Sequence, residues 1–188
     1  MVIVIVCIFL HADDIVLLTP SVDALQQMIH ICEFELVLLE MALNLKKSVC
    51  IRFGPRFDAK CAPLVTNSGQ QLSWVKSCRY LGVYFLAHRN FKCVFDYAKK
   101  AYYRSFNSVF GKVGCHASEE ITIKLIQTKC LPVILFGLDA CPVNSTDKHS
   151  FDFLLTRSLM KLFQTGSNSI ITECRKIFNV KLVSECIH

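Results

Sequence analysis

Two adjacent aspartates, Asp13 and Asp14, lie between two of the most apolar runs of this chain. The run before them, residues 2–10, is rich in β-branched side chains, and Ile15 to Leu18 follow directly. Neither run alternates strictly between polar and apolar residues, which is typical of strands that are buried or covered by helices on one side. The stretch FLHADDIVLL therefore predicts a β-hairpin with residues 11–14 at or near its tip, so that both carboxylates project from a rigid support.

The composition excludes a disordered protein, because 53% of the 188 residues are hydrophobic and only 19% are charged. The net charge of +6 suits a polyanionic partner without requiring one. The apolar start has no basic segment or cleavage site of a signal peptide, and Asp13 stops it short of the roughly 20 residues that a spanning helix needs. We therefore expect no association with a membrane.

The 11 cysteines are scattered, mostly in apolar segments, and no two have the C-x-x-C spacing of a zinc site. This pattern also argues against a secreted disulfide framework. Free thiols in a reducing compartment explain it better, so we expect an intracellular protein, cytoplasmic or nuclear.

The segment after the hairpin alternates helical and strand-like patterns. Pro20 and Ser21 favour a helix start, and apolar residues then recur every three or four positions from Leu25 to Leu43, which predicts about five or six helical turns. A short strand is predicted over residues 48–53 and a surface excursion over 56–70. Strands are predicted over 72–75 and 80–85, joined by 76–79, with Gly82 allowing another backbone to approach closely.

Beyond residue 90 the pattern is helical. Helices are predicted over 91–110, over 118–130 with Ser118 as the cap, and over 145–163. In the last helix one face is shared by Phe151, Leu154, Leu155, Ser158, Leu159 and Leu162. We therefore predict an α+β fold with a boundary near residue 90, between a mixed α/β domain (1–90) and an all-helical domain (91–188).

The aspartate pair has two interpretations. Asp is favoured in turns, so Asp13 and Asp14 could simply occupy a solvated hairpin turn. Like charges held side by side, however, repel unless a cation or water lies over them. Mg²⁺ is the expected cation, because it is held by one or two carboxylates together with water and substrate phosphates. A two-metal site would need a further carboxylate from another strand.

The order of these segments resembles one known family. FLHADDIVLL, a long helix, LNLKKSVCIRFG, RYLGVYF and a helical tail resemble the C-terminal half of the reverse transcriptase domain of non-LTR (LINE-like) retrotransposons. KCLPVILFGLDA and residues 145–163 resemble the segment after the thumb of these enzymes. The resemblance implies that residues 1–90 form a partial palm-like antiparallel sheet with a helix, followed by an all-helical thumb-like and post-thumb region (91–188).

The resemblance also implies a function for the aspartates. The family is an RNA-directed DNA polymerase (nucleotidyltransferase), in which a primer 3′-hydroxyl attacks the α-phosphate of a deoxynucleotide under two Mg²⁺ ions. Asp13 corresponds to the catalytic, metal-binding aspartate of the palm and Asp14 to its supporting partner. Lys47, in the family's Asn-x-x-Lys-Ser segment, would lie near the incoming nucleotide. Alternatively, Lys47 is a solvated charge at a helix end.

The expected macromolecular partners are an RNA template and a DNA primer. Arg79, Tyr80 and Gly82 match the Tyr-Leu-Gly motif near the primer-contacting hairpin, although Tyr80 and Leu81 could instead fill the core. From Arg79 to Lys112 the chain has seven basic residues and one acid, with tyrosines interleaved, and this pattern favours contacts to nucleic acid. The expected contacts come from Lys99, Lys100 and Arg104, and the interleaved tyrosines of this segment are Tyr97, Tyr102 and Tyr103. A merely solvated basic face is the alternative.

Two departures from the family pattern limit what is expected. His11 stands where the family usually has Phe or Tyr. Only twelve residues precede Asp13, so the first palm strand with the other metal-binding aspartate cannot fit before it. We therefore expect half a metal site, exposed hairpin edges and an inactive isolated chain. The missing N-terminal half of the polymerase would be its partner; a non-catalytic nucleic-acid-binding remnant and a product without function are the alternatives.

Overall fold

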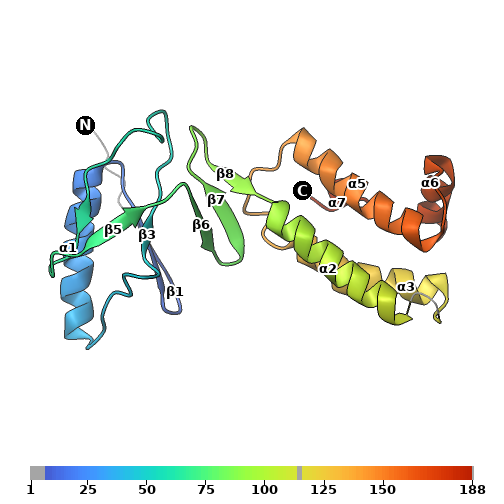
Figure 1. The fold of residues 1–188 in the computed structure, drawn as a ribbon, viewed down its shortest axis with the longest axis horizontal. Coiled ribbons are helices and arrows are strands. Elements are labelled where there is room, and N and C mark those ends of the chain that lie inside the picture. Colours follow the sequence, from blue (N-terminus) through green and yellow to red (C-terminus); the bar gives the residue numbers. More distant parts are fainter. Residues whose placement is uncertain (1–6, 114–115, 188) are drawn as a thin grey trace. The chain divides into compact units, whose positions relative to one another are not determined.

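The computed structural model describes residues 7–113 and 116–187, which divide into two units (Figure 1). The first unit contains the residues up to Cys78 together with Leu86–Asn90, and the second contains Arg79–Phe85 and the residues from Phe91 onward. Helices and small sheets are both present, so the predicted mixture of α and β structure is confirmed. None of the helices in the described ranges has the length and apolar character needed to cross a membrane.

The predicted hairpin is present at the start of the first unit. β1 (Cys7–His11) and β2 (Asp14–Leu18) pair antiparallel, from Cys7 opposite Leu18 to His11 opposite Asp14. Residues 2–6 of the predicted first strand lie outside the described residues. The expectation of a buried strand is wrong for β1, because Ile8, Phe9 and Leu10 are 52–73% exposed. Within the described ranges β1 pairs only with β2, and so its apolar side chains stay uncovered.

The helix after the hairpin is α1 (Val22–Leu38). Its predicted start at Pro20 and Ser21 is confirmed, and Ser21 is its cap: the Ser21 hydroxyl accepts the N–H of Ala24 at 3.1 Å, which satisfies one free donor of the first turn. The helix is shorter than predicted because Glu40 adopts a left-handed conformation (φ +56°) and the N–H of Met41 returns to the carbonyl of Leu36 at 2.8 Å. Leu43 therefore lies outside the helix despite its favourable spacing.

A three-stranded sheet packs against α1. It is ordered β3–β5–β4 and consists of β3 (Val49–Cys50), β4 (Leu64–Val65) and β5 (Gln71–Trp74). β3 runs parallel to β5, whereas β4 is antiparallel to it, so the strands of this unit do not make one antiparallel sheet.

The core of the first unit is small. Ile29 of α1 meets Cys50, Leu64 and Leu72 of the three strands. The predicted surface excursion over residues 56–70 is thus wrong at Leu64, which is fully buried. The side-chain amide of Gln26 also pairs with β4, accepting the N–H of Val65 and donating to its carbonyl, so this sheet edge is closed by a side chain.

A further sheet has the order β6–β7–β8: β6 (Ser77–Tyr80), β7 (Val83–Leu86) and β8 (Lys92–Val94). The predicted strand over residues 80–85 is wrong in its middle, because Leu81 and Gly82 form a tight turn with φ of +46° and +84°. The segment predicted as a connection, residues 76–79, supplies most of β6. The predicted helix start at residue 91 is also wrong, since β8 precedes the helix.

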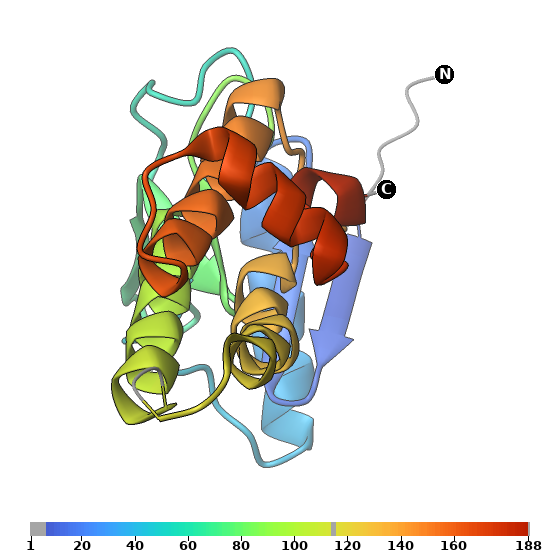
Figure 2. The same ribbon diagram turned by 90° about the vertical axis from the view of Figure 1, so that its right-hand side faces the viewer.

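The remainder of the second unit is helical (Figures 1 and 2). Its elements are α2 (Asp96–Val113), α3 (Glu119–Leu125), the π-helical turn η1 (Ile126–Cys130), α4 (Leu131–Leu135), α5 (Ser145–Leu162), α6 (Asn168–Ile177) and α7 (Val183–Cys186). Ser118 caps α3 as predicted, by accepting the N–H of Ile121. Pro132 lies just after η1 and lacks the N–H for an α-helical bond to Thr128, which explains why the helix widens there.

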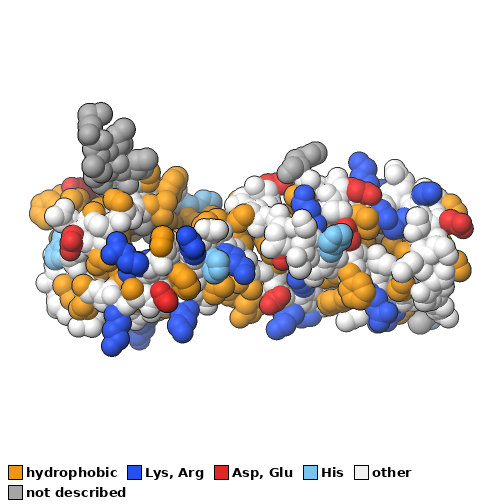
Figure 3. All heavy atoms as spheres, turned by 90° about the horizontal axis from the view of Figure 1, so that it is seen from above, with side chains coloured by type: hydrophobic (Ala, Val, Ile, Leu, Met, Phe, Trp, Pro, Cys, Tyr) orange, Lys and Arg blue, Asp and Glu red, His pale blue; other side chains and the backbone are white. Residues whose placement is uncertain are grey.

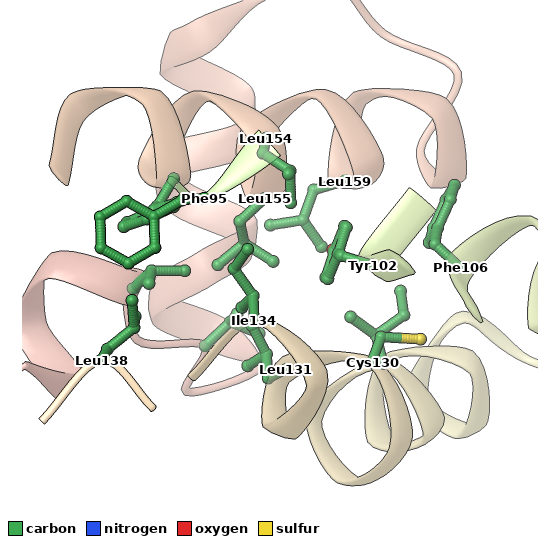
Figure 4. Close-up of a cluster of buried hydrophobic side chains, with 14 of the residues drawn as sticks. Phe95, Tyr102, Phe106, Cys130, Leu131, Ile134, Leu138, Leu154, Leu155 and Leu159 are labelled. Carbon is green, nitrogen blue, oxygen red and sulfur yellow. The ribbon is translucent and has the colours of Figure 1, made fainter. Parts of the chain in front are cut away.

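The predicted apolar face of α5 is confirmed, since all six of its residues are buried. Figure 4 shows how Leu154, Leu155 and Leu159 from this face lie around Tyr102 of α2 and Ile134 of α4. Phe151 meets Phe95 edge to face, with 5.3 Å between the ring centroids. The second unit thus has one continuous core between α2, α5 and the α3–η1–α4 run.

The buried thiol of Cys93 makes the stability of this core sensitive to alkali. Burial raises the pKa of Cys93 from 9.0 to about 12, and a hydrogen bond and charge interaction with Cys141 add to the rise. The folded chain therefore keeps a proton that the unfolded chain loses above pH 9.0. We expect the free energy of unfolding to fall as pH rises from 9.0 toward 12, and to fall less steeply in Cys93→Ala.

Urea unfolding under reducing conditions, at neutral pH and at pH values within this window, would measure the effect. Cys174→Ala, a half-buried cysteine of α6, is the matched control. Parallel pH profiles for the wild type and Cys93→Ala would contradict the assignment.

Candidate functional site

The two aspartates lie at the tip of the hairpin. Ala12 and Asp13 form a two-residue turn between His11 and Asp14, which face each other across it. Of the two turn residues only Ala12 has positive φ (+50°), the pattern of a type II′ turn, whose first position favours Gly. All four residues are exposed, and among the residues described neither carboxylate is in an ion pair. Both side chains are therefore free to bind a cation from solvent.

The donor set at this tip fits a weakly held divalent ion. Two adjacent carboxylates are enough for Mg²⁺ when water and substrate oxygens complete its coordination. Residues 7–113 and 116–187 contain no group of three or more His, Cys, Asp or Glu side chains placed to hold a metal together. The described part of the chain thus offers carboxylates from one hairpin only, and the metal site stays a prediction.

Lys47 lies on a turn beyond α1. Its side chain is exposed, and its N–H donates to the carbonyl of Asn44 at 3.0 Å. Lys47 is thus a solvated charge, as the alternative interpretation states, but it does not lie at a helix end, because α1 ends at Leu38. Within the described ranges, no hydrogen bond or ion pair joins Lys47 to the hairpin tip.

Arg79 and Lys100 belong to a cation–aromatic ladder in the second unit, which we define as Arg79, Tyr84, Tyr97 and Lys100. The guanidinium of Arg79 lies 5.9 Å from the ring centroid of Tyr84. That ring stacks on Tyr97, with 3.8 Å between centroids and 10° between planes, and the Lys100 ammonium lies 5.8 Å from the Tyr97 ring. The tyrosines thus hold a cation at each end of the ladder.

The other basic residues of α2 differ in how accessible they are. Lys99 is half-buried, lies 5.4 Å from the ring centroid of Phe151 and approaches Asp96 at 4.0 Å, so it is engaged within the fold. Arg104 is exposed. Tyr102 is fully buried, so the expectation that it could stack on a base is wrong, whereas Tyr103 is 39% exposed.

Tyr80 and Gly82 have structural roles at the β6–β7 turn. Tyr80 is half-buried at the end of β6. A Cβ on Gly82 would lie 2.9 Å from Cε1 of Phe136, and one on Gly137 would lie 2.7 Å from Cγ2 of Val83. The close neighbour of Gly82 is therefore a side chain and not, as predicted, another backbone. Two glycines allow this turn to pack tightly against the end of α4.

Sequence reasoning missed Tyr84, which links the two cations of the ladder. The signal was present, because a two-residue turn at Leu81–Gly82 places residues 79 and 84 opposite each other. The turn was not predicted because leucine is unusual at positive φ, so Leu81 does not indicate a turn.

Comparisons with protein-family models, with curated proteins and with solved structures found no match to this chain. The resemblance to reverse transcriptases thus rests on the residues themselves.

The turn at the hairpin tip stores strain at Ala12. A left-handed residue other than Gly costs about 1–2 kcal/mol, so Ala12→Gly should stabilise the hairpin by up to about 1 kcal/mol after the added chain entropy. Ala12→Val should loosen it, because a β-branched side chain tolerates positive φ least. Amide hydrogen exchange in β1 and β2 measures both effects, and faster exchange in the glycine variant would show that the turn is not strained.

Proposed function

We propose that this chain is part of an RNA-directed DNA polymerase of the LINE-like reverse transcriptase type. It would contribute the aspartate hairpin of the palm and a thumb-like helical region. The observation that carries the proposal is the tip of the β1–β2 hairpin, where Asp13 and Asp14 are both exposed at the end of two paired apolar strands. A turn that served only to reverse the chain would not need two adjacent like charges.

Uncovered apolar surface of the first unit also supports the proposal. Phe34, Val37 and Leu38 on α1 are 62–70% exposed, in addition to the exposed side chains of β1. Figure 3 shows hydrophobic side chains spread over the face of this unit seen there. Such surface is typical of a unit that lacks a packing partner. We propose that a further palm segment, bearing the second metal-binding aspartate, covers it.

The aspartates fit a role in binding Mg²⁺. When bound, the ion supplies charge neutralisation for the phosphates and activates the attacking hydroxyl. The part of this chain would be to hold the cation through Asp13, with Asp14 beside it. Since the described residues bring no carboxylate from a second element to that place, we expect no synthesis by the chain alone.

Nucleic-acid binding without catalysis is the second candidate function, and the cation–aromatic ladder favours it. Arg79 and Lys100 are exposed and held by two stacked tyrosines, so their charges are presented in fixed positions. Preorganised cations are suited to the phosphates of a primer or template. Both candidate functions share this binding step, and they differ in whether Asp13 is used.

Mn²⁺ binding and primer extension test the role of Asp13. We expect Mn²⁺, as a paramagnetic probe for Mg²⁺, to broaden the NMR signals around residues 11–14, and Asp13→Asn to abolish this selective broadening because one carboxylate charge is lost. Asp58→Asn, an exposed aspartate of the same unit, is the matched control.

Template–primer extension with Mg²⁺ should give no product with the chain alone. Synthesis that depends on Asp13 would instead show that the chain contains a complete site. No selective broadening at the hairpin would contradict the metal-binding proposal.

The ladder should account for part of the binding to an RNA–DNA template–primer. Changing both Arg79 and Lys100 to Gln should weaken binding about tenfold at low salt and lower the slope of log K against log salt by about 2. Arg56→Gln with Lys60→Gln removes the same charge from exposed residues of the first unit. Fluorescence anisotropy would measure both, and an equal loss in the control would contradict a specific ladder. If the wild type does not bind at all, neither candidate function survives.

A further inference from the structure

A cleft in the second unit lies between α2 and the end of α5. Its volume is about 540 Å³, which is within the range of small-molecule sites. The residues used below line it: Tyr103, Phe106 and Asn107 from α2, and Arg157, Lys161 and Gln164 from α5 and the turn after it. Phe106 is almost completely buried. No residue of the ladder and none of the hairpin lines this cleft.

The charge of the cleft is positive and unopposed. Arg157 and Lys161 lie one helical turn apart on α5, and both are exposed. No Asp or Glu lines the cleft, and neither cation is in an ion pair within the described ranges. The helix dipole accounts for a lysine in the last turn of α5, but it does not account for Arg157 a turn earlier. This arrangement is suited to an anion.

Lys161 is held in place by three contacts. Its ammonium donates to Oδ1 of Asn107 at 3.2 Å, and lies 4.9 Å from the ring centroid of Phe110 and 5.7 Å from that of Phe106. The ammonium therefore has donors left for a ligand, in a position fixed before the ligand arrives. The amide nitrogen of Asn107 is likewise left as a donor, because its oxygen is the atom that accepts from Lys161.

The cleft also contains groups that suit a base. Tyr103 is 39% exposed and lines the cleft, and its ring meets that of Tyr102 edge to face, with 5.9 Å between the centroids and 74° between the planes. Gln164 is exposed, and its side-chain amide, like that of Asn107, has the donors and acceptors that read the polar edge of a base. Cations, an accessible aromatic ring and two amides are the groups by which proteins bind nucleotides.

We propose that this cleft binds a nucleoside phosphate, with the phosphate at Arg157 and Lys161 and the base against Tyr103. The same chemistry is offered by a free nucleotide and by one nucleotide of a single strand. The inference goes beyond the proposed function, since it requires neither the aspartates nor the ladder.

Binding of the full chain to a short labelled single-stranded oligonucleotide tests the cleft. Changing Arg157 and Lys161 to Gln should weaken binding about tenfold at low salt and reduce the slope of log K against log salt by about 1.4. The control, Lys176→Gln with Lys181→Gln, removes two exposed charges of the same unit and should change binding less than about twofold. Equal losses in the two variants would overturn the proposal.

Gln164→Gly provides a test that damage to the fold cannot explain. Gln164 has φ +51° just after α5, and the N–H of Thr165 bonds to the carbonyl of Met160 at 3.1 Å, the helix ending in which Gly is preferred. This variant should melt at or above the temperature of the wild type and yet bind the oligonucleotide more weakly. Unchanged binding by both Gln164→Gly and the double cleft variant would overturn the proposal.

The source of the nucleotide is decided by competition with adenosine 5′-monophosphate. Displacement of the oligonucleotide, lost in the double cleft variant, assigns a free nucleotide as a ligand; binding of the oligonucleotide without displacement assigns the single strand. The inference would be overturned if neither the binding of the oligonucleotide nor the binding of the monophosphate depended on the cleft. The ladder variants should retain competition at the cleft, so failure of this proposal and failure of the proposed function are distinguishable.

Discussion

Burial of one face of α5 against α2 is the packing on which the second unit depends. Leu154, Leu155 and Leu159 from α5 lie around Tyr102 of α2, and the α3–η1–α4 run completes the same core. Because α2 also carries Tyr97 and Lys100 of the ladder and Tyr103 and Asn107 of the cleft, this core fixes one side of both candidate binding sites. Loss of a large buried side chain there costs about 2–5 kcal/mol, and would disturb both sites together.

The first unit is held much less firmly. Among the described residues, four buried side chains form its core, and of the hairpin only Leu17 is packed against it. The exact placement of Asp13 and Asp14 thus depends on a two-stranded ribbon with little support, although metal sites used in catalysis need side chains held within a fraction of an ångström. This contrast agrees with the proposal that a further palm segment completes the unit.

Local patterns determined which elements could be predicted. Pro20 and Ser21 predict a helix start and Ser118 predicts a cap, and the buried face of α5 follows from spacings of three and four, because these signals act within a few residues. Leu43 continues the apolar spacing of α1 but lies beyond its end. The helix ends because Glu40 adopts a left-handed conformation, which a glutamate does not predict. At the candidate site, the position of Asp13 and Asp14 at the hairpin tip follows from the two apolar runs that flank them, so it could be predicted. The cleft joins residues of two helices that no local pattern relates, so only the fold reveals it. In the ladder, the turn between β6 and β7 is a local signal for the pairing of Arg79 with Tyr84, whereas the stacking of Tyr84 on Tyr97 of α2 follows only from the fold.

The pairing of β3 with β5 has a consequence for how the chain folds. Val49 pairs with Ser73 in parallel, so a long loop must close before this sheet of the first unit can form. The second unit relies mainly on helices and on contacts between neighbouring segments, which form faster in general. Because most of the first unit precedes the second in the chain, it leaves the ribosome first. Since it also folds more slowly, its apolar hairpin stays accessible to chaperones for longer than the helices that follow it.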